Sequence, residues 1–560
     1  MTKPLRRPAT EVPNYAENLR AFPLERVEFR RPRPHGRDLA SGLDWCRAAA
    51  DRWRTLLAEA RDAGRDLRPI GATWSFSEVG VTNGTLASTT WLDQIFPADP
   101  DWLELCARER DAPDKLVLAG AGATVKQLNT WLEGNGLSLC TSGASNGQTV
   151  AGAMATGTHG SVPDLCGIQH HVVGIHLLGG PDASHDWWLE HPCRPCLSGE
   201  AAERLGAKLT RDADLFDAAL VHLGGLGVVN AVLLRVRPEF VMDVIQTKRV
   251  VSREDLALLA RSDFAGFAQA IGKNRAPYFV QVIFNPFGPF TKPACVKLLL
   301  SGASRAPFDR RVSIWWRRWI RRWRPLTLIK RYLDRYPHDA DEAVAMMMNK
   351  LFPDIPSRSG RGTRYNWTAA MPDPEADGMG QLYTAAVAVP REHLVDAVEK
   401  MAEKFREHHG APLVFTLRFV RGGSDCNAGL LAFTRFEHSA VIDLDGIWNF
   451  RSPIAAERAF QALRDLNIPF SHHWGKLGEI TRDKIEKDYG PSADRNTPLA
   501  RWKEARAKLL DPDLREHFGG KALRDWGLMS PLPPAAGGAA PPLPPARSRP
   551  ATAAAAPDRA

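Results

Sequence analysis

The chain has 560 residues, of which 44% are hydrophobic and 24% charged, and its formal net charge is +9 at pH 7. This length accommodates two or three domains, and this composition is typical of soluble globular proteins. No apolar run approaches the roughly 18 residues of a membrane-spanning helix, and no apolar signal region follows the first residues, so we expect a cytoplasmic protein.

The N-terminal third alternates helix and strand signals. Residues 43–64 place apolar side chains at helical spacing and end at Gly64, which predicts a helix. A short strand is expected at 67–70, before the Gly/Ser-rich loop GATWSFSEVG, and a second strand is expected at 115–123. Thr124 and Gln127 then occupy capping-box positions at the start of a helix that ends near Gly134.

The stretch from Thr141 to Ser161 reads TSGASNGQTVAGAMATGTHGS and is built almost wholly of small residues. Small residues let the backbone approach a ligand closely, and their N–H groups can bind phosphate oxygens. Neither this stretch nor the loop at 71–77 fits the Rossmann or Walker pattern. Two such loops favour a long dinucleotide in a groove between them, whereas either loop alone could equally be a tightly packed core turn.

The remaining elements divide the chain. Strands are predicted at 172–180 and 227–238, and residues 391–410 form an amphipathic helix pattern. We expect an α+β domain over 1–240, a second domain of strands and helices over 241–470, and a helical segment over 471–528. The Pro/Ala-rich residues 529–560 cannot bury a core and are predicted to be disordered.

Two local features carry alternatives. From Asp309 to Arg324 the chain has seven Arg against one Asp, or six of the nine net charges, so the rest is nearly balanced. On a helix, its four Trp would lie on one face and its Arg on the other, which suits either a peripheral contact at an anionic membrane through 310–324 or a helix with a buried Trp face. No nucleic-acid-binding motif accompanies this charge.

Eight scattered Cys favour reduced thiols, and the lone pair Cys193 and Cys196 lacks zinc-site partners, so no metal is expected.

Four segments together resemble a known family. They are RPIGATWSFSEVGVTNGTL (68–86), SNGQTVAGAMATGTHGS (145–161), LGGLGVVNAVLLRVRP (223–238) and HHWGKL (472–477). In this order they look like the vanillyl-alcohol-oxidase type flavoproteins, nearest to the alditol oxidase and aldonolactone oxidase branch (L-gulonolactone and D-arabinono-1,4-lactone oxidases). The resemblance covers roughly residues 35–240 and 410–528. It implies a two-subdomain PCMH-type FAD-binding domain with an inserted α+β substrate-binding cap.

The resemblance also assigns cofactor residues. Those expected to hold FAD are Ile70, Gly71, Ala72, Thr73, Trp74, Ser75, Gly143, Ala144, Thr149, Gly152, Thr156, Gly157, Thr158, His159, Val228 and His473, with Val228 toward the adenine end and His473 at the isoalloxazine. In many relatives a His links covalently to the flavin at the position of Trp74. Indole cannot form that bond, so we predict noncovalent FAD.

Three residues are the expected catalytic set. Relatives carry Glu-x-Arg on a cap strand facing the flavin, and the corresponding residues here are Thr416 and Arg418. Arg418 can stabilise an alkoxide or bind an anionic substrate, and Lys476 would be a second cation near the reacting carbon. Thr416 cannot act as a base. Without the resemblance, an Arg on a strand is more often a surface charge.

The expected function is FAD-dependent oxidation of a CH–OH group in a sugar-derived lactone, polyol or related alcohol, with hydride passing to flavin N5. Gly143 aligns with the residue over the flavin C4a–N5 edge, where a side chain would obstruct dioxygen, so O2 with formation of H2O2 is the favoured acceptor. Ala144 stands where alditol oxidases carry a substrate-contacting Ser, which argues against a simple alditol. The alternatives are a membrane-associated binding or scaffold protein, or a dehydrogenase that uses another acceptor on a non-sugar alcohol.

Overall fold

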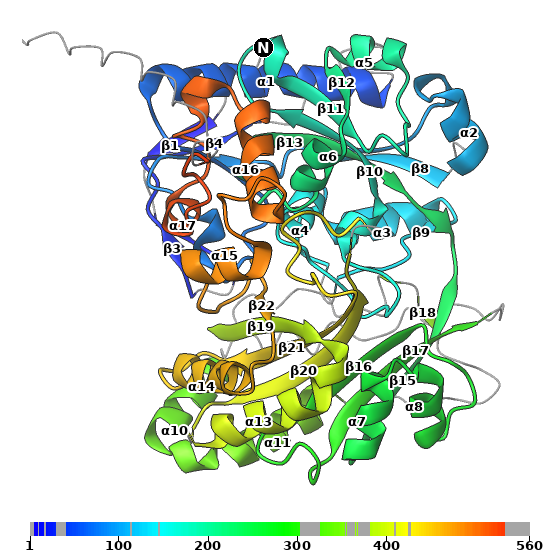
Figure 1. Ribbon diagram of the computed structural model, residues 1–560, viewed down its shortest axis with the longest axis vertical. Helices are drawn as coiled ribbons and strands as arrows, with labels where there is room; N and C mark the ends of the chain where they lie inside the picture. The colour runs from blue at the N-terminus through cyan, green and yellow to red at the C-terminus, as the bar shows by residue number, and fades with distance from the viewer. Residues whose placement is uncertain are drawn as a thin grey trace, which may run out of the picture.

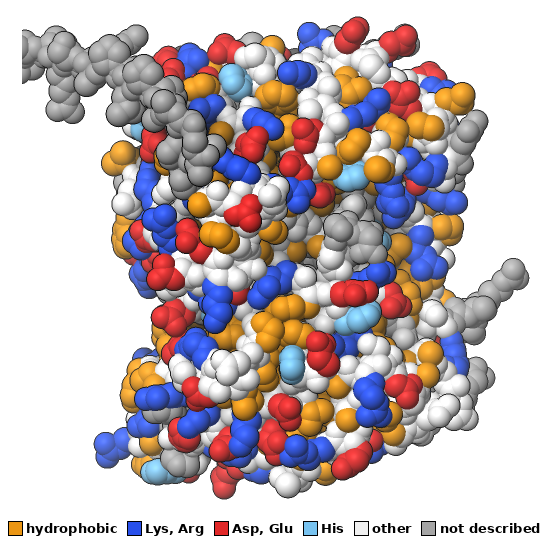
Figure 2. Space-filling model, in the orientation of Figure 1, with side chains coloured by type: hydrophobic (Ala, Val, Ile, Leu, Met, Phe, Trp, Pro, Cys, Tyr) orange, Lys and Arg blue, Asp and Glu red, His pale blue; other side chains and the backbone are white. Residues whose placement is uncertain are grey.

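The computed structural model of the protein shows two lobes, one above the other in the view of Figure 1. It describes residues 5–8, 11–15, 18–29, 41–111, 115–143, 146–302, 325–352, 354, 364–365, 367, 381–407, 410–423 and 427–532. On the face shown in Figure 2, basic and acidic side chains are interspersed over both lobes. No helix in these ranges is both long and apolar enough to cross a membrane.

The first lobe is built on a four-stranded and a six-stranded sheet, and it also contains two two-stranded sheets. The smaller has the order β1-β4-β6-β5, formed by β1 (Leu5–Pro8), β4 (Glu25–Glu28), β6 (Thr85–Ser88) and β5 (Leu67–Ile70). The larger has the order β12-β11-β10-β13-β8-β7, formed by β12 (Lys208–Arg211), β11 (Asp186–Glu190), β10 (Val172–Leu178), β13 (Val228–Arg235), β8 (Leu116–Gly120) and β7 (Ile95–Pro97). The larger sheet is antiparallel except for the pair β11–β12.

Helices of the first lobe begin and end at the signals in the sequence. Helix α1 (Gly42–Ala63) is capped by the Ser41 side chain and ends where Gly64 adopts a φ of 57°. Helix α3 (Val125–Gly134) has the capping box that Thr124 and Gln127 predict. The shorter elements are α2 (Leu105–Asp111), α4 (Val150–Ala155), α5 (Gly199–Leu205), α6 (Ala213–Leu220), β2 (Val12–Pro13), β3 (Arg20–Ala21), β9 (Leu137–Ser138) and β14 (Arg237–Pro238).

The second lobe is built on one antiparallel sheet. Its order is β18-β15-β17-β16-β20-β21-β19-β22, formed by β18 (Arg364–Tyr365), β15 (Val241–Arg249), β17 (Ala294–Gly302), β16 (Phe279–Phe284), β20 (Leu413–Arg421), β21 (His438–Ile447), β19 (Leu382–Pro390) and β22 (Ser471–His472). This sheet therefore spans nearly the range expected for the second domain, although the domain division itself stays a prediction.

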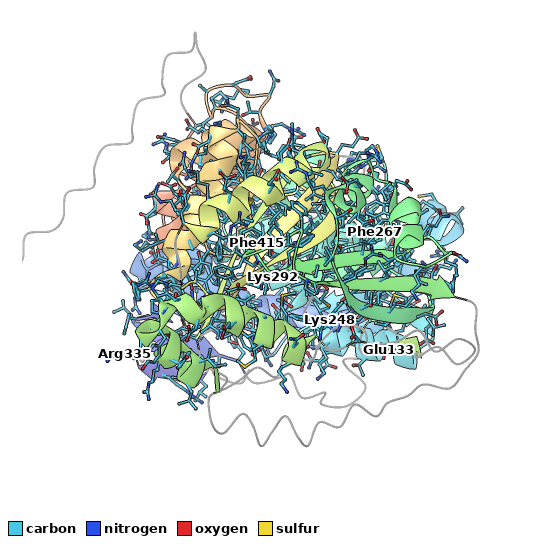
Figure 3. All side chains as sticks on the ribbon, turned by 90° about the horizontal axis from the view of Figure 1, so that it is seen from below. Glu133, Lys248, Phe267, Lys292, Arg335 and Phe415 are labelled. Carbon is cyan, nitrogen blue, oxygen red and sulfur yellow. The ribbon has the colours of Figure 1, made fainter. Side chains whose placement is uncertain are left out.

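Helices cover one face of this sheet and leave most of the other toward the first lobe. The covering helices are α7 (Arg253–Ala260), α8 (Phe264–Ala270), α13 (Leu394–Arg406) and α14 (Ser452–Asp465), and they share one apolar core with the strands. Phe267 and Phe415 lie in this core (Figure 3). Helices α10 (Pro325–Arg335) and α11 (Ala340–Leu351) pack instead around the end of the sheet, where Val344, Met347 and Met348 meet the strands.

The C-terminal helices return to the first lobe (Figure 1). They are α15 (Arg482–Tyr489), α16 (Pro498–Leu509) and α17 (Lys521–Asp525). The Trp502 indole N–H donates to the Val221 carbonyl at 3.2 Å, and the Leu67 N–H donates to the His517 carbonyl at 2.9 Å. The C-terminal segment therefore packs on the first lobe, and the predicted α+β fold class is confirmed.

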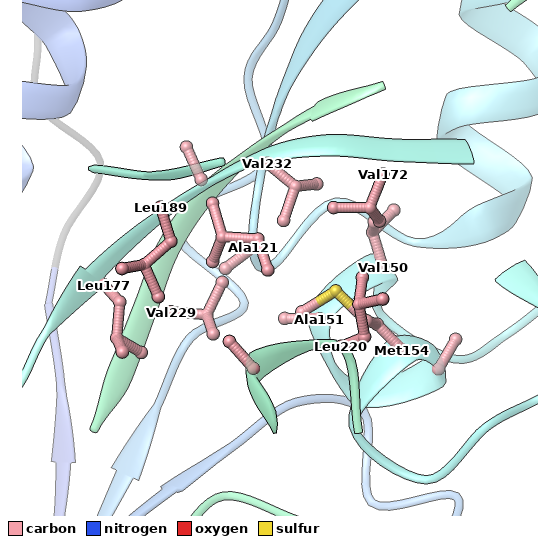
Figure 4. Close-up of a cluster of buried hydrophobic side chains, with 14 of the residues drawn as sticks. Ala121, Val150, Ala151, Met154, Val172, Leu177, Leu189, Leu220, Val229 and Val232 are labelled. Carbon is pink, nitrogen blue, oxygen red and sulfur yellow. The ribbon is translucent and has the colours of Figure 1, made fainter. Parts of the chain in front are cut away.

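Helix α4 explains the small residues around it. On one side, Val150 and Met154 pack into the core with Val172, Leu220 and Val232 (Figure 4). On the other side its small residues line a cavity, together with the loop that follows. Both alternatives for this stretch therefore hold: the segment packs tightly in the core and also brings its backbone to the wall of a cavity.

Candidate active site

A cavity of about 590 Å³ lies where the two lobes meet, within the range of roughly 300–1,000 Å³ usual for ligand sites. Its wall comes from widely separated parts of the chain. They are residues 12–15, 19 and 21, the loop 68–81, residues 86 and 89, residues 148–159, the loop 222–229, residues 347 and 352, strands β19, β20 and β21, and the segment 473–476.

The first loop approaches the second so closely that it requires glycine. A Cβ at Gly71 would overlap the Thr149 side chain, and Thr149 in turn caps α4 by accepting from the Gly152 N–H at 3.3 Å. Thr73 has a φ of 54°, in the left-handed region that a β-branched residue rarely adopts. Such strained backbone persists where surrounding contacts hold it.

Those contacts come from residues 11–15 and 18–21, which we call the N-terminal strap. The Asn14 side chain donates to the Ser75 carbonyl at 2.8 Å, and the Tyr15 N–H donates to the Thr73 carbonyl at 2.9 Å. The Tyr15 ring stacks on Trp74, with centroids 3.7 Å apart and an interplanar angle of 13°. The sequence analysis missed the strap, because two-residue strands carry no periodic signal.

The segment that follows α4 brings His159 beside His473, with ring centroids 5.9 Å apart. His159 Nδ1 contacts the Gly160 carbonyl at 2.9 Å, and a carbonyl only accepts, so Nδ1 carries the proton. His159 Nε2 is then a buried acceptor with no partner in the described chain. Burial, followed by the charge of Arg418, lowers the pKa of His159 to about 3, so the ring is neutral at physiological pH.

Arg418 and Lys476 converge on one carboxylate. Arg418 Nη1 lies 3.0 Å from Asp443 Oδ2, and Lys476 pairs with Asp443 Oδ1. Burial favours protonation of Asp443, but the charges of Arg418 and Lys476 outweigh it and hold the pKa of Asp443 well below its ordinary value. The surface alternative for Arg418 is wrong, because its side chain is only 11% exposed.

The position of Asp443 relates directly to Thr416. The two residues are Cα partners across the pair β20–β21, so the neighbouring strand supplies a carboxylate beside Thr416. Asp445 follows two residues later on the same face. It accepts a hydrogen bond from the Thr384 hydroxyl, lies 3.8 Å from Lys476 Nζ and lines the cavity. The sequence analysis missed both aspartates, although their alternate spacing in an apolar strand was a usable signal.

The structure brings most of the predicted site residues together. Those that line the cavity are Ile70, Gly71, Ala72, Thr73, Trp74, Ser75, Thr149, Gly152, Thr156, Thr158, His159, Arg418, His473 and Lys476. Gly143, Gly157, Val228 and Thr416 are not in its wall, and Ala144 lies outside the described residues. The Trp/Arg segment 309–324 also lies outside them.

The residues present fit FAD. The glycine-dependent contact of the two loops leaves main chain at the cavity wall, and the unpartnered acceptor His159 Nε2 lies in the same wall. Residues 70–75 and 149–159 would hold the cofactor, with His473 and the two cations at its cap side.

Comparison with known proteins supports FAD as the cofactor. Residues 48–182 match the family model described as FAD binding domain. Fold and site therefore define a flavoprotein with a PCMH-type FAD-binding domain, and the predicted cofactor FAD is confirmed.

Several named proteins are similar to part of this chain. Long-chain alcohol oxidase of an uncultured marine euryarchaeote is 29% identical over 181 residues, which is 32% of this chain and 31% of that protein. Putative D-arabinono-1,4-lactone oxidase of Neurospora crassa is 28% identical over 209 residues, 37% of this chain and 32% of that protein. L-gulonolactone oxidase of Mus musculus is 26% identical over 187 residues, which is 33% of this chain and 35% of that protein. The matched region thus spans about a third of each relative.

Solved structures share the fold over nearly the whole chain. Cholesterol oxidase from B. sterolicum has a TM-score of 0.63 at 13% identity and covers 95% of this chain and 98% of its own. Xylooligosaccharide oxidase from Myceliophthora thermophila has a TM-score of 0.56 at 12% identity. The match covers 91% of this chain and 93% of that one. At these identities the similarity shows the fold, including the second lobe.

Proposed function

We propose that the protein is an FAD-dependent oxidoreductase that converts a CH–OH group to C=O, with O2 as the electron acceptor and H2O2 as the second product. The relatives named above are oxidases of alcohols or lactones, and another, from Mycobacterium tuberculosis, is named L-gulono-1,4-lactone dehydrogenase. Their names agree on CH–OH chemistry and differ in substrate and acceptor.

One observation carries the proposal: Arg418 and Lys476 lie in the wall of the cavity that also contains the FAD-binding loops. Both cations pair with the buried carboxylate Asp443, and Asp445 lies 3.8 Å from Lys476 Nζ, so two carboxylates fix the two positive groups in place at the cavity wall. A preorganised positive charge in a water-poor site stabilises the negative charge that develops on a hydroxyl oxygen as its proton leaves.

A proton acceptor lies beside these cations. Asp443 is held by both of them, whereas Asp445 faces the cavity and is held by Thr384. We assign Asp445 as the group that takes the hydroxyl proton. When bound, FAD supplies the two-electron acceptor for the hydride that leaves the carbon. Loss of one proton and one hydride converts CH–OH to C=O, and O2 takes the two electrons and two protons to become H2O2.

The experiment follows the visible absorption of the purified holoprotein when alcohols are added without oxygen. We expect bleaching with an alcohol substrate, and formation of one H2O2 per turnover when air is admitted. Asp445→Asn should slow bleaching by about 10²-fold, as for loss of a positioned proton acceptor, while the surface variant Asp214→Asn should match the parent.

Three results would count against parts of this proposal. Flavin that no alcohol bleaches would favour the binding or scaffold alternative. Bleaching that air does not reverse would favour a dehydrogenase with another acceptor. Parental rates in Asp445→Asn would remove Asp445 from the proton step.

A further inference from the structure

The cavity extends past the cations into the second lobe, and its wall there is apolar. The lining side chains come from α11 and its C-terminal end, from β19, from β20 and from β21. They are Met347, Phe352, Leu382, Val414 and Ile447, all of which belong to one apolar cluster. We call this part of the cavity the cap end.

The geometry of β20 gives the distance between the cap end and the cation Arg418. Val414 and Arg418 are four residues apart on β20, so they share a face and their Cα atoms are separated by roughly 13 Å. Ile447 lies on the neighbouring strand, two residues beyond Asp445 and opposite Leu382. The cavity therefore has a charged middle and an apolar end that is long enough for an extended organic group.

Polar side chains at the cap end are confined to the side of the cations. Of the described residues that line it, Thr384 and Asp445 are polar, and these two are bonded to each other beside Lys476. Tyr383 also borders the cavity, but its ring belongs to the core on the opposite face. There its ring centroid lies 5.6 Å from that of Trp448.

A polyol or sugar lactone would be poorly matched to this wall. Each substrate hydroxyl placed against Val414, Ile447 or Met347 would lose its hydrogen bonds to water without gaining a partner, which weakens binding strongly. Apolar groups gain free energy in the same place.

We propose that the substrate is an alcohol with one reacting hydroxyl and an apolar body, such as a long-chain or fused-ring alcohol, and that the cap end binds this body. The inference rests on the proposed function and narrows its substrate class. The reacting hydroxyl lies at Arg418, Lys476 and Asp445, and the apolar body extends toward Val414 and Ile447.

The test uses holoprotein and n-alkanols from four to twelve carbons, with sorbitol and L-gulono-1,4-lactone for comparison. We expect kcat/KM to rise about fourfold per added methylene until the cap end is filled, as burial of one methylene predicts. Sorbitol and the lactone should leave the flavin oxidised. Val414→Thr and Ile447→Thr should each lower kcat/KM for decanol about tenfold more than kcat/KM for butanol, whereas the exposed Val250→Thr should change neither.

A second readout does not depend on turnover. Hexanoate, octanoate and decanoate carry an anionic head for the two cations and have no CH–OH hydrogen to lose. Calorimetric titration should give affinities that increase about fourfold per methylene, with a smaller increment in Val414→Thr.

The outcomes separate the two proposals. If sorbitol or the lactone bleaches the flavin and alkanols do not, the apolar substrate is wrong and the proposed function stands. If no alcohol bleaches it but carboxylate affinity depends on chain length, the oxidation is wrong and the apolar cap end stands. If neither effect occurs, both proposals are overturned.

Discussion

Trp74 lies between two neighbours that fix its ring. It stacks on Tyr15 on one side, and a Cβ at Gly147 would overlap its indole on the other. The ring carries no nucleophile suited to attack the flavin methyl group, so we predict that contacts and hydrogen bonds alone hold the cofactor.

We therefore expect acid precipitation of the holoprotein to release all of its flavin into the supernatant. Fluorescence that remains with the denatured chain on a gel would contradict noncovalent binding. Trp74→His is the matched variant, since it places at this position the residue that the resemblance associates with covalent attachment.

Arg418 and Lys476 are expected to act on the reacting oxygen. Arg418→Ala or Lys476→Ala should lower turnover by about 10²-fold or more, the usual effect of losing one preorganised donor, with unchanged FAD content. Arg204→Ala, which removes an exposed Arg paired with Asp44, is the control. Parental turnover in both site variants would show that neither cation stabilises the transition state.

At the scale of elements, the N-terminal strap joins the cofactor loop through three main-chain carbonyls, those of Thr73, Ser75 and Phe76, and one ring stack. An aromatic stack contributes about 0.5–1.5 kcal/mol beyond its buried area. Tyr15→Ala should therefore raise the Kd for FAD about three- to tenfold, measured by fluorescence titration of apoprotein. Phe22→Ala changes an exposed ring next to the strap and should leave the Kd unaltered; an equal effect of both variants would argue against a specific role of Tyr15.

Elements with periodic patterns were the ones that sequence reasoning located. The periodicity of 391–410 predicted a helix, and α13 forms there; the alternation of 227–238 predicted a strand, and β13 forms there. The two loops of small residues, together with Arg418 and Lys476, predicted many of the residues that line the cavity. Asp443 and Asp445 were not found, because their importance depends on which strand lies beside Thr416. Met347 was not found for a related reason: a helix pattern shows an apolar face but not the cavity that the face borders.

At the scale of the whole molecule, several buried histidines make stability depend on pH. Burial is the largest cause that lowers the pKa of His159, His171, His222 and His472 to about 3, and that of His473 well below its ordinary value. Below pH 6.5 the unfolded chain binds protons that the folded chain does not, so the free energy of unfolding falls as pH falls.

We expect the Tm to decrease from pH 7.5 to pH 5, with each such histidine costing up to about 1.4 kcal/mol per pH unit below 6.5. His472→Phe tests the cause, because both ring nitrogens of His472 lack a described partner and its ring packs between Phe460 and Phe470. This variant should show a shallower decrease in Tm; a slope equal to that of the parent would exclude His472 as a source of acid lability.

The basic, Trp-rich segment 309–324 remains a prediction of the sequence. If it contacts an anionic membrane, each basic group contributes about 1 kcal/mol and the Trp side chains add interfacial burial. We expect cosedimentation with anionic liposomes that is lost at high salt and in a Trp315/Trp319/Trp323→Ala variant. A parent protein that ignores liposomes, with a variant that fails to fold, would instead place the Trp face in a core.

The Phe76 N–H donates to the Gly475 carbonyl at 2.8 Å, and the Ser77 hydroxyl donates to the Trp474 carbonyl at 2.5 Å. These bonds join the first cofactor loop to a segment about 400 residues later, which a ribosome synthesising 5–20 residues per second reaches roughly 20–80 s afterwards. During this interval the first loop is present without the segment that closes it. We therefore expect flavin loading to follow the synthesis of residues 474–475.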